Sequence, residues 1–168
     1  MTPRALLNSR RWLLLMAAVC VLAVGGALVA QHAFDMRPCP WCILQRLIYV
    51  EMALLCVAGA LVPSRPARIA LIALVLLFAV FGAMSAVYQH EVAANSVSCN
   101  LSFAEKVISG SGIDSAMPFL FQVTASCAES VFKLFGVPFE FWSLMLFSAL
   151  VLGALALLLR SVRLPVAG

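Results

Sequence analysis

The sequence predicts an all-α membrane protein, a four-helix transmembrane bundle with two outer loops. Hydrophobic residues make up 64% of the 168 residues and charged residues only 11%, which is more apolar material than one soluble core of this size could bury. Four apolar segments have nearly the length, about 20 residues, that a helix needs to cross a bilayer. We therefore predict a single integral membrane domain over residues 1–168.

The four predicted spans cover residues 12–30, 43–62, 69–88 and 141–159, and the two outer loops cover residues 31–42 and 89–138. A cleavable signal peptide is the alternative for the first span, but the apolar run exceeds the about 7 to 15 residues typical of one. The tight turn at residues 63–68 makes the second and third helices an antiparallel pair. We expect Glu51, the one acid in the second span, to serve packing between helices.

The distribution of charge predicts the orientation of the chain. The arginines of the N-terminus, of the 63–68 turn and of the C-terminus are accompanied by no acidic residue. Because such segments stay in the cytoplasm, both outer loops fall on the opposite face. We therefore expect a multi-pass protein of the bacterial inner membrane with both termini in the cytoplasm. The net charge of +4 does not indicate nucleic acid, because the basic residues are scattered and not interleaved with aromatic ones.

A Cys-Pro-Trp-Cys motif at residues 39–42 closes the first outer loop. Proline suits the first position of a helix, so Cys39 is expected to cap the second span and Cys42 to lie in its first turn. The backbone N–H groups and the dipole at that helix end favour a thiolate, and Arg46, one turn further on the same face, adds a positive charge. Tyr49 continues this face. The combination indicates redox chemistry at the membrane surface.

The six cysteines fall into two groups. Cys20 and Cys56 lie near the middle of spans, where a thiol is a small apolar filler, so we expect them to be structural. The other four lie in the outer loops, on the side of a bacterial cell where disulfides persist: Cys39, Cys42, Cys99 and Cys127. Purely structural disulfides are one alternative to catalysis. Zinc is disfavoured, because the second loop lacks the close pair of cysteines that a zinc ribbon needs, so we predict no metal.

Two thiol pairs can exchange electrons by thiolate attack on a disulfide, but an acceptor must take the electrons away. The sequence has neither a Gly-x-Gly-x-x-Gly dinucleotide motif nor the Cys-x-x-Cys-His of a c-type haem. A membrane quinone fits, because its ring can approach Cys42 while Arg46 donates hydrogen bonds to a ring oxygen. His90, just past the third span, is either a further donor or proton source at this site or an ordinary interfacial histidine.

These features together resemble the DsbB family of disulfide bond formation proteins, quinone reductases that reoxidise the periplasmic thiol oxidase DsbA. The resemblance covers nearly the whole chain and rests on residues 39–46, on residues 88–90 at the end of the third span, and on Cys99 with residues 127–129 in the second loop. One departure is Gln45, since some members of the family carry a glutamate before the arginine.

The resemblance implies a division of labour among the outer cysteines. Cys99 would form the mixed disulfide with a DsbA-like thioredoxin-fold oxidase of the periplasm, and Cys127 would be its loop companion. Cys39 would then exchange with Cys127, while the Cys42 thiolate engages ubiquinone or menaquinone beside Arg46. Electrons would run from the partner through the second loop to the Cys-x-x-Cys pair and then to the membrane quinone pool. Without the resemblance, four cysteines allow three pairings.

Two other functions remain as alternatives. A vitamin K epoxide reductase-like enzyme also pairs thiols with a quinone in a helical membrane protein, but the position of the Cys-x-x-Cys between the first two spans argues against it. A non-catalytic membrane scaffold with disulfide-stapled outer loops is the alternative from another class. Arg46 and Gln45 argue against a non-catalytic scaffold, because polar groups at the lipid boundary cost free energy and are usually functional.

Overall fold

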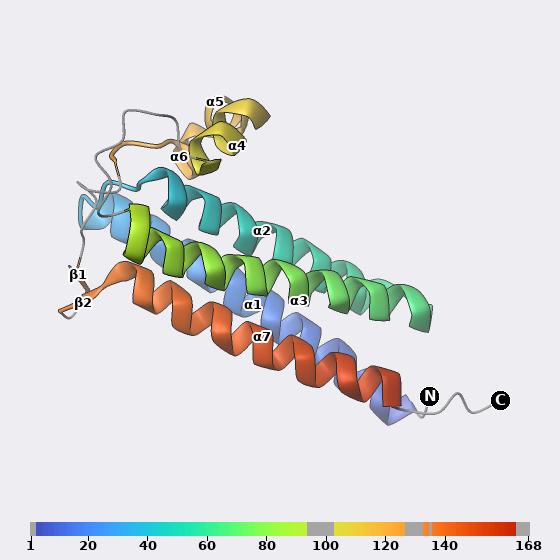
Figure 1. Cartoon of the computed structure of the whole chain (residues 1–168). Coiled ribbons are helices and arrows are strands. Elements are labelled where there is room, and N and C mark those ends of the chain that lie inside the picture. Colours follow the sequence, from blue (N-terminus) through green and yellow to red (C-terminus); the bar gives the residue numbers. More distant parts are fainter. Residues whose placement is uncertain (1–2, 94–102, 127–132, 135, 164–168) are drawn as a thin grey trace.

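A computed structural model describes residues 3–93, 103–126, 133–134 and 136–163. Its main feature is a bundle of four long helices (Figure 1): α1 (Pro3–Ala33), α2 (Pro40–Leu61), α3 (Arg65–Tyr88) and α7 (Phe139–Arg163). Each contains a stretch that is long and apolar enough to cross a membrane. The predicted fold class is confirmed: this is an all-α, multi-pass membrane protein.

Short elements gather at one end of the bundle, which we call the loop end (Figure 1). A π-helix, η1 (Gln89–Ala93), continues α3 directly. Three short helices follow: α4 (Phe103–Ser111), α5 (Ile113–Ala116) and α6 (Pro118–Phe121). Two short antiparallel strands, β1 (Lys133–Leu134) and β2 (Val137–Pro138), lead into α7. The start of α1 and the end of α7 lie together at the opposite end, which we call the terminal end.

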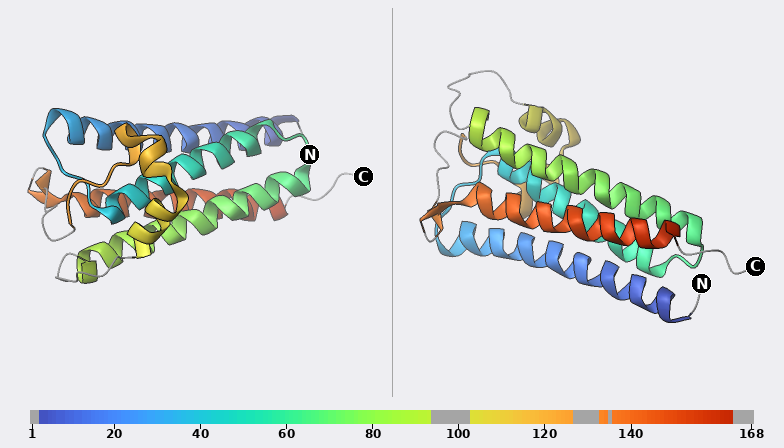
Figure 2. Two further views of the ribbon diagram at one scale, coloured as in Figure 1. Left: turned by 90° about the horizontal axis from the view of Figure 1, so that it is seen from above. Right: turned by 60° about the horizontal axis from the view of Figure 1, so that its bottom comes forward.

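The four long helices are not packed evenly. Figure 2 shows from two directions that they run roughly along one axis. Packing proceeds in chain order, with α1 mainly against α2, α2 against α3, and α3 against α7. The remaining pair, α1 and α7, touches only sparsely. The bundle is therefore closed on three sides and loosely closed on the fourth.

One layer of aromatic side chains fixes α2, α3 and α7 relative to one another. Gly82 of α3 lies against the ring of Phe147 so closely that a Cβ atom there would overlap the ring. Phe147 in turn stacks on Tyr49 of α2, with ring centroids 4.2 Å apart. The Tyr49 hydroxyl donates to the backbone carbonyl of Ser143 at 3.2 Å. This layer supports the cavity described below, because Tyr49 and Ser143 also line it.

At the terminal end, two arginines bind the ends of helices. Arg68 is buried and donates from Nε to the carbonyl of Gly59 at 3.1 Å and from Nη2 to that of Val62 at 2.6 Å. It therefore satisfies carbonyls that α2 leaves unpaired at its C-terminus and complements the negative end of the helix dipole. Arg65 donates to the carbonyl of Ser161 near the end of α7 at 2.7 Å.

The structure corrects one expectation for the second span. Glu51 is exposed on the surface of α2 and does not pack between helices. The reason is helical geometry: five residues separate Glu51 from the buried Arg46, which turns it about 140° round the axis, away from the bundle. The interhelical packing of this part of α2 comes instead from Tyr49, Met52 and Cys56.

Candidate active site

The helix α2 begins at the dithiol motif. Pro40 occupies the first turn, Cys39 is the N-cap, and the Cys39 sulfur accepts a hydrogen bond from the backbone N–H of Cys42 at 3.4 Å. The predicted cap and first-turn positions are thus confirmed. The two sulfurs lie 3.2 Å apart. Cys39 is fully buried whereas Cys42 is partly exposed and lines the cavity described below, so Cys42 is the thiol of this pair that a molecule in that cavity can reach.

Arg46, one turn below Cys42, connects three segments of the chain. Its guanidinium donates from Nη1 to the side-chain oxygen of Gln31 at 2.9 Å and to the backbone carbonyl of Leu120 at 2.5 Å. Gln31 belongs to the end of α1, and Leu120 belongs to α6. The side chain is only 4% exposed. A fixed positive charge is therefore held close to the dithiol by residues that are far apart in the sequence.

Two buried glutamines meet beside Cys42. The amide nitrogen of Gln45 donates to the side-chain oxygen of Gln89 at 2.8 Å. The amide nitrogen of Gln89 donates in turn to the Cys42 sulfur at 3.3 Å. From the sequence, Gln45 is a polar group at the lipid boundary and a departure from the family pattern, and Gln89 has no predicted role of its own. A polar residue at the end of an apolar span was the available signal, but which side chain it reaches depends on how α3 packs against α2.

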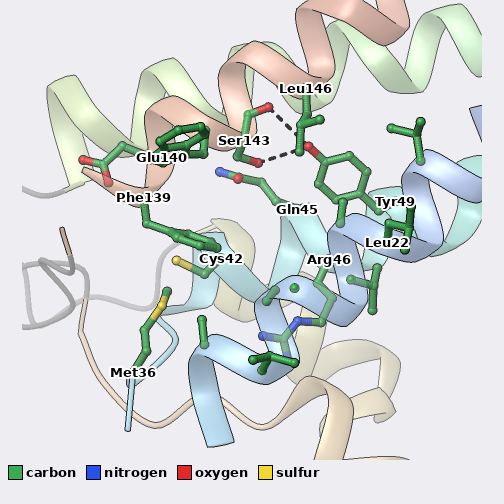
Figure 3. A pocket seen from close by; sticks show the side chains of 18 of the residues that line it. Leu22, Met36, Cys42, Gln45, Arg46, Tyr49, Phe139, Glu140, Ser143 and Leu146 are labelled. Atoms are coloured by element: carbon green, nitrogen blue, oxygen red, sulfur yellow. Dashed lines mark hydrogen bonds between the residues drawn. The ribbon is translucent and has the colours of Figure 1, made fainter. Parts of the chain in front are cut away.

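A cavity of about 650 Å³ lies next to these residues, between α1, α2 and α7. Figure 3 shows Cys42 beside Phe139 at one end of it and Leu22 with Tyr49 at the other. The lining from α1, between Val19 and Ala30, is entirely apolar. The polar lining comes mainly from α2 and α7: Cys42, Gln45, Arg46, Tyr49, Gln89, Glu140 and Ser143. The predicted residues Cys42, Arg46 and Tyr49 thus share one cavity.

The cavity opens on the side where α1 and α7 touch sparsely. Leu22 and Val29 of α1 and Trp142 of α7 line the cavity and are also exposed on the surface of the bundle. Since these residues belong to membrane-spanning helices, that surface faces lipid. An apolar molecule with a polar head can therefore enter from the bilayer and bring its head to Cys42.

His90 lies outside this cavity. Its Nδ1 is 3.0 Å from the carboxylate of Glu140, and its ring meets the ring of Phe141 edge-on, with centroids 4.6 Å apart. Both His90 and Glu140 line a second cavity of about 150 Å³, and Glu140 lines the large one as well. The structure thus places Glu140 between His90 and the cavity of Cys42. Glu140 is not among the site residues predicted from the sequence, although an acid among the aromatic residues that open a span was a usable signal.

The two cysteines predicted in the second loop, Cys99 and Cys127, lie outside the described residues. The described parts of that loop pack onto the start of α2. Trp41 meets the rings of Tyr88 and Phe103, with centroids 4.7 Å and 6.5 Å away. The backbone N–H of Thr124 donates to the carbonyl of Pro38 at 3.1 Å. The second loop therefore touches the residue that precedes the first cysteine of the motif.

The remaining described cysteines are packed inside the bundle. Cys20 of α1 and Cys56 of α2 are fully buried in the hydrophobic core, in line with the structural role expected for them. In the part of the chain that the structure describes, no three His, Cys, Asp or Glu side chains are grouped so that they could hold a metal ion.

A dithiol at a helix N-terminus, next to a cavity that opens to lipid, defines a membrane-embedded thiol–disulfide oxidoreductase. The family model described as "Disulfide bond formation protein DsbB" matches residues 9–157. The chain belongs to this family, and it is a disulfide-forming oxidoreductase of a membrane. It is 31% identical over 159 residues to Disulfide bond formation protein B 1 of Pseudomonas syringae pv. syringae, with 94% of each chain covered. It is 31% identical over 154 residues to Disulfide bond formation protein B of Burkholderia thailandensis, with 91% of each covered.

Proposed function

We propose that this protein reoxidises a DsbA-like thioredoxin-fold oxidase of the periplasm and passes the electrons to a membrane quinone, either ubiquinone or menaquinone. The single observation that carries the proposal is the cavity between α1, α2 and α7, which brings Cys42 and Arg46 together and opens to lipid. A soluble acceptor would need an opening to water at this site. A lipid-soluble acceptor needs the apolar wall that α1 supplies.

The lining residues fit a quinone. The volume of about 650 Å³ lies within the range of about 300–1,000 Å³ that is usual for small-molecule sites. The polar groups of α2 and α7 would hold the ring, and the apolar side chains of α1 would hold part of the isoprenoid tail. A quinone supplies a two-electron, two-proton acceptor. Arg46 contributes a positive charge that favours negative charge at the ring oxygens, and Gln31 and Leu120 keep this charge in place.

The path of electrons into the site is proposed to run through the second loop. Cys99 would exchange with the partner, and Cys127 would then exchange with Cys39. The hydrogen bond from Thr124 to Pro38 supports this pairing, since Thr124 and Cys127 are three residues apart and such a segment reaches about 10 Å. Oxidation of the Cys39–Cys42 dithiol to a disulfide then releases two electrons and two protons toward the quinone.

His90 is proposed to supply or accept protons indirectly. It does not line the cavity, but its partner Glu140 does. The 3.0 Å contact between the His90 ring and the Glu140 carboxylate connects the second cavity to the large one, so the pair is suited to pass a proton between them. In this arrangement Glu140 and not His90 faces the quinone.

The proposed setting is the bacterial inner membrane, with both termini in the cytoplasm and the loop end in the periplasm. Among the described residues, the terminal end carries Arg10, Arg11, Arg160 and Arg163, and no acid lies near them in the sequence. The loop end carries most of the acids, including Asp35, Glu91, Glu105 and Asp114. This distribution follows the rule that positively charged segments stay in the cytoplasm.

A coupled assay on purified protein in detergent tests the proposal. A reduced thioredoxin-fold oxidase and a soluble quinone are added, and the loss of quinone absorbance is followed. We expect turnover by the unaltered protein and none by Cys99→Ser, because the entry thiol is missing. Absence of turnover by the unaltered protein with several oxidases and both quinone classes, while the outer cysteines stay paired, would favour a stapled scaffold instead.

Substitutions at two neighbouring glycines test whether the quinone binds in the cavity. Gly26 lines the cavity whereas Gly25 does not, and neither has another residue within 4 Å of the position a Cβ would take. Gly26→Leu is expected to fill part of the space for the quinone and to raise the KM for quinone about tenfold, the equivalent of about 1.4 kcal/mol. Gly25→Leu is the matched control and is expected to leave this KM unchanged. Equal values of KM in the two variants would place the quinone elsewhere.

A further inference from the structure

We propose that Gln89 is a catalytic residue that stabilises the thiolate of Cys42, and that Gln45 is a positioning residue that orients the Gln89 amide. The proposal rests on the proposed function in one respect, namely that Cys42 reacts as the thiolate. It goes beyond that function because it assigns the hydrogen-bond donor on which the reactivity of Cys42 depends.

The geometry fixes which end of the Gln89 amide faces the sulfur. Its nitrogen donates to Cys42 at 3.3 Å, and its oxygen accepts from Gln45 at 2.8 Å. If the amide turned over, its oxygen would face the sulfur and its nitrogen would face the nitrogen of Gln45. The first contact would be unfavourable with the Cys42 thiolate, and the second would be unfavourable as long as the Gln45 amide keeps its orientation. The two glutamines are buried, at 4% and 6% exposure, so water competes little for these groups.

The hydrogen bond from Gln89 matters most at the step in which Cys39 no longer donates to the Cys42 sulfur. In the dithiol, the Cys39 thiol donates to the Cys42 sulfur across 3.2 Å. Once Cys39 is joined to another sulfur, it has no proton to donate. Within the described part of the chain, Gln89 is then the side chain that still donates to Cys42. A hydrogen bond to an ionised acceptor is about twice as strong as one between neutral groups, so this donor favours the thiolate.

An amide is suited to this position because it donates a hydrogen bond without a negative charge. A carboxylate in place of Gln89 would lie beside the thiolate in a buried site, where two like charges disfavour each other's ionised form. The backbone also influences where the side chains point, because the wider π-helical turn η1 starts at Gln89. Gln89 points to Cys42 while its neighbour His90 contacts Glu140. Such turns are frequent at functional sites.

The test is the pH dependence of Cys42 alkylation in the absence of quinone. The full-length protein carries Cys39→Ala, which removes the other thiol donor, and is reduced in detergent and treated with iodoacetamide. Modification of the Cys42 peptide is quantified by mass spectrometry. Gln89→Met, which keeps the length of the side chain, is expected to move the midpoint of the profile up by about one to two pH units. This equals about a 10- to 100-fold smaller thiolate population at neutral pH.

Further variants separate the two roles and control for packing. Gln89→Glu keeps a polar side chain and is expected to shift the midpoint in the same direction. Gln45→Met is expected to give a smaller upward shift, because the Gln89 amide is still present but no longer held. Ser85→Ala removes a buried hydroxyl one turn earlier on α3, which donates to the carbonyl of Gly82 at 2.7 Å, and is expected to leave the midpoint unchanged.

The outcomes are decisive for each residue. An unchanged midpoint in folded Gln89→Met or Gln89→Glu would overturn the catalytic role of Gln89. A shift in Gln89→Met with none in Gln45→Met would overturn the positioning role of Gln45. Quinone reduction by the unaltered protein is measured in parallel. Because the alkylation profiles involve no quinone, failure of that reaction would count against the proposed function and not against the amide pair.

Discussion

Replacing Cys42 with serine is expected to reduce quinone turnover to the rate without protein. Serine keeps nearly the size of cysteine and can still accept the hydrogen bond from Gln89, so the surrounding packing should survive. It cannot form a disulfide with Cys39 or act as a thiolate at neutral pH. The loss is therefore chemical, and no concentration of quinone should restore it. Quinone absorbance at saturating reduced oxidase is the measurement.

The matched control for this variant is Cys56→Ala on the same helix. Cys56 is fully buried in the core and is not among the residues that line the cavity. Its replacement should cost some stability through the small void it leaves, but quinone turnover should stay near that of the unaltered protein. If Cys42→Ser kept measurable turnover, the assignment of this thiol as the one that engages quinone would be wrong.

Arg46→Ala is expected to have two effects that can be measured separately. The KM for quinone should rise about 10- to 100-fold, because a charged donor at the ring is lost, and excess quinone should restore part of the rate. The protein should also lose about 1 kcal/mol of stability for each hydrogen bond removed, which are those to the partly buried Gln31 side chain and Leu120 carbonyl. Thermal unfolding in detergent, followed by circular dichroism, gives the second quantity.

Arg68→Ala separates these two effects. Arg68 is likewise buried and binds the carbonyls of Gly59 and Val62, but it lies at the terminal end, far from the cavity. We expect it to lower stability to a similar extent and to leave the KM for quinone unchanged. An Arg46→Ala protein with unaltered Michaelis behaviour toward quinone would show that Arg46 is only a structural clamp.

The sequence alone was sufficient for the features that depend on local chemistry. Apolar length and composition predict four membrane helices, because a bilayer accepts few other segments. The proline after Cys39 predicts a helix start, and a spacing of four residues predicts that Cys42 and Arg46 share a face. These relations follow from the geometry of one helix and need no knowledge of its neighbours.

The tertiary structure decided everything that depends on how separate helices meet. Only packing shows that Gln89 of η1 reaches Cys42, that Glu140 separates His90 from the cavity, and that Glu51 faces outward. Arg46 could be placed beside Cys42 from the sequence, but its bonds to Gln31 and Leu120 could not. The physical reason is that a helix fixes the angles among its own side chains, whereas its rotation against other helices depends on contacts such as that of Gly82 with Phe147.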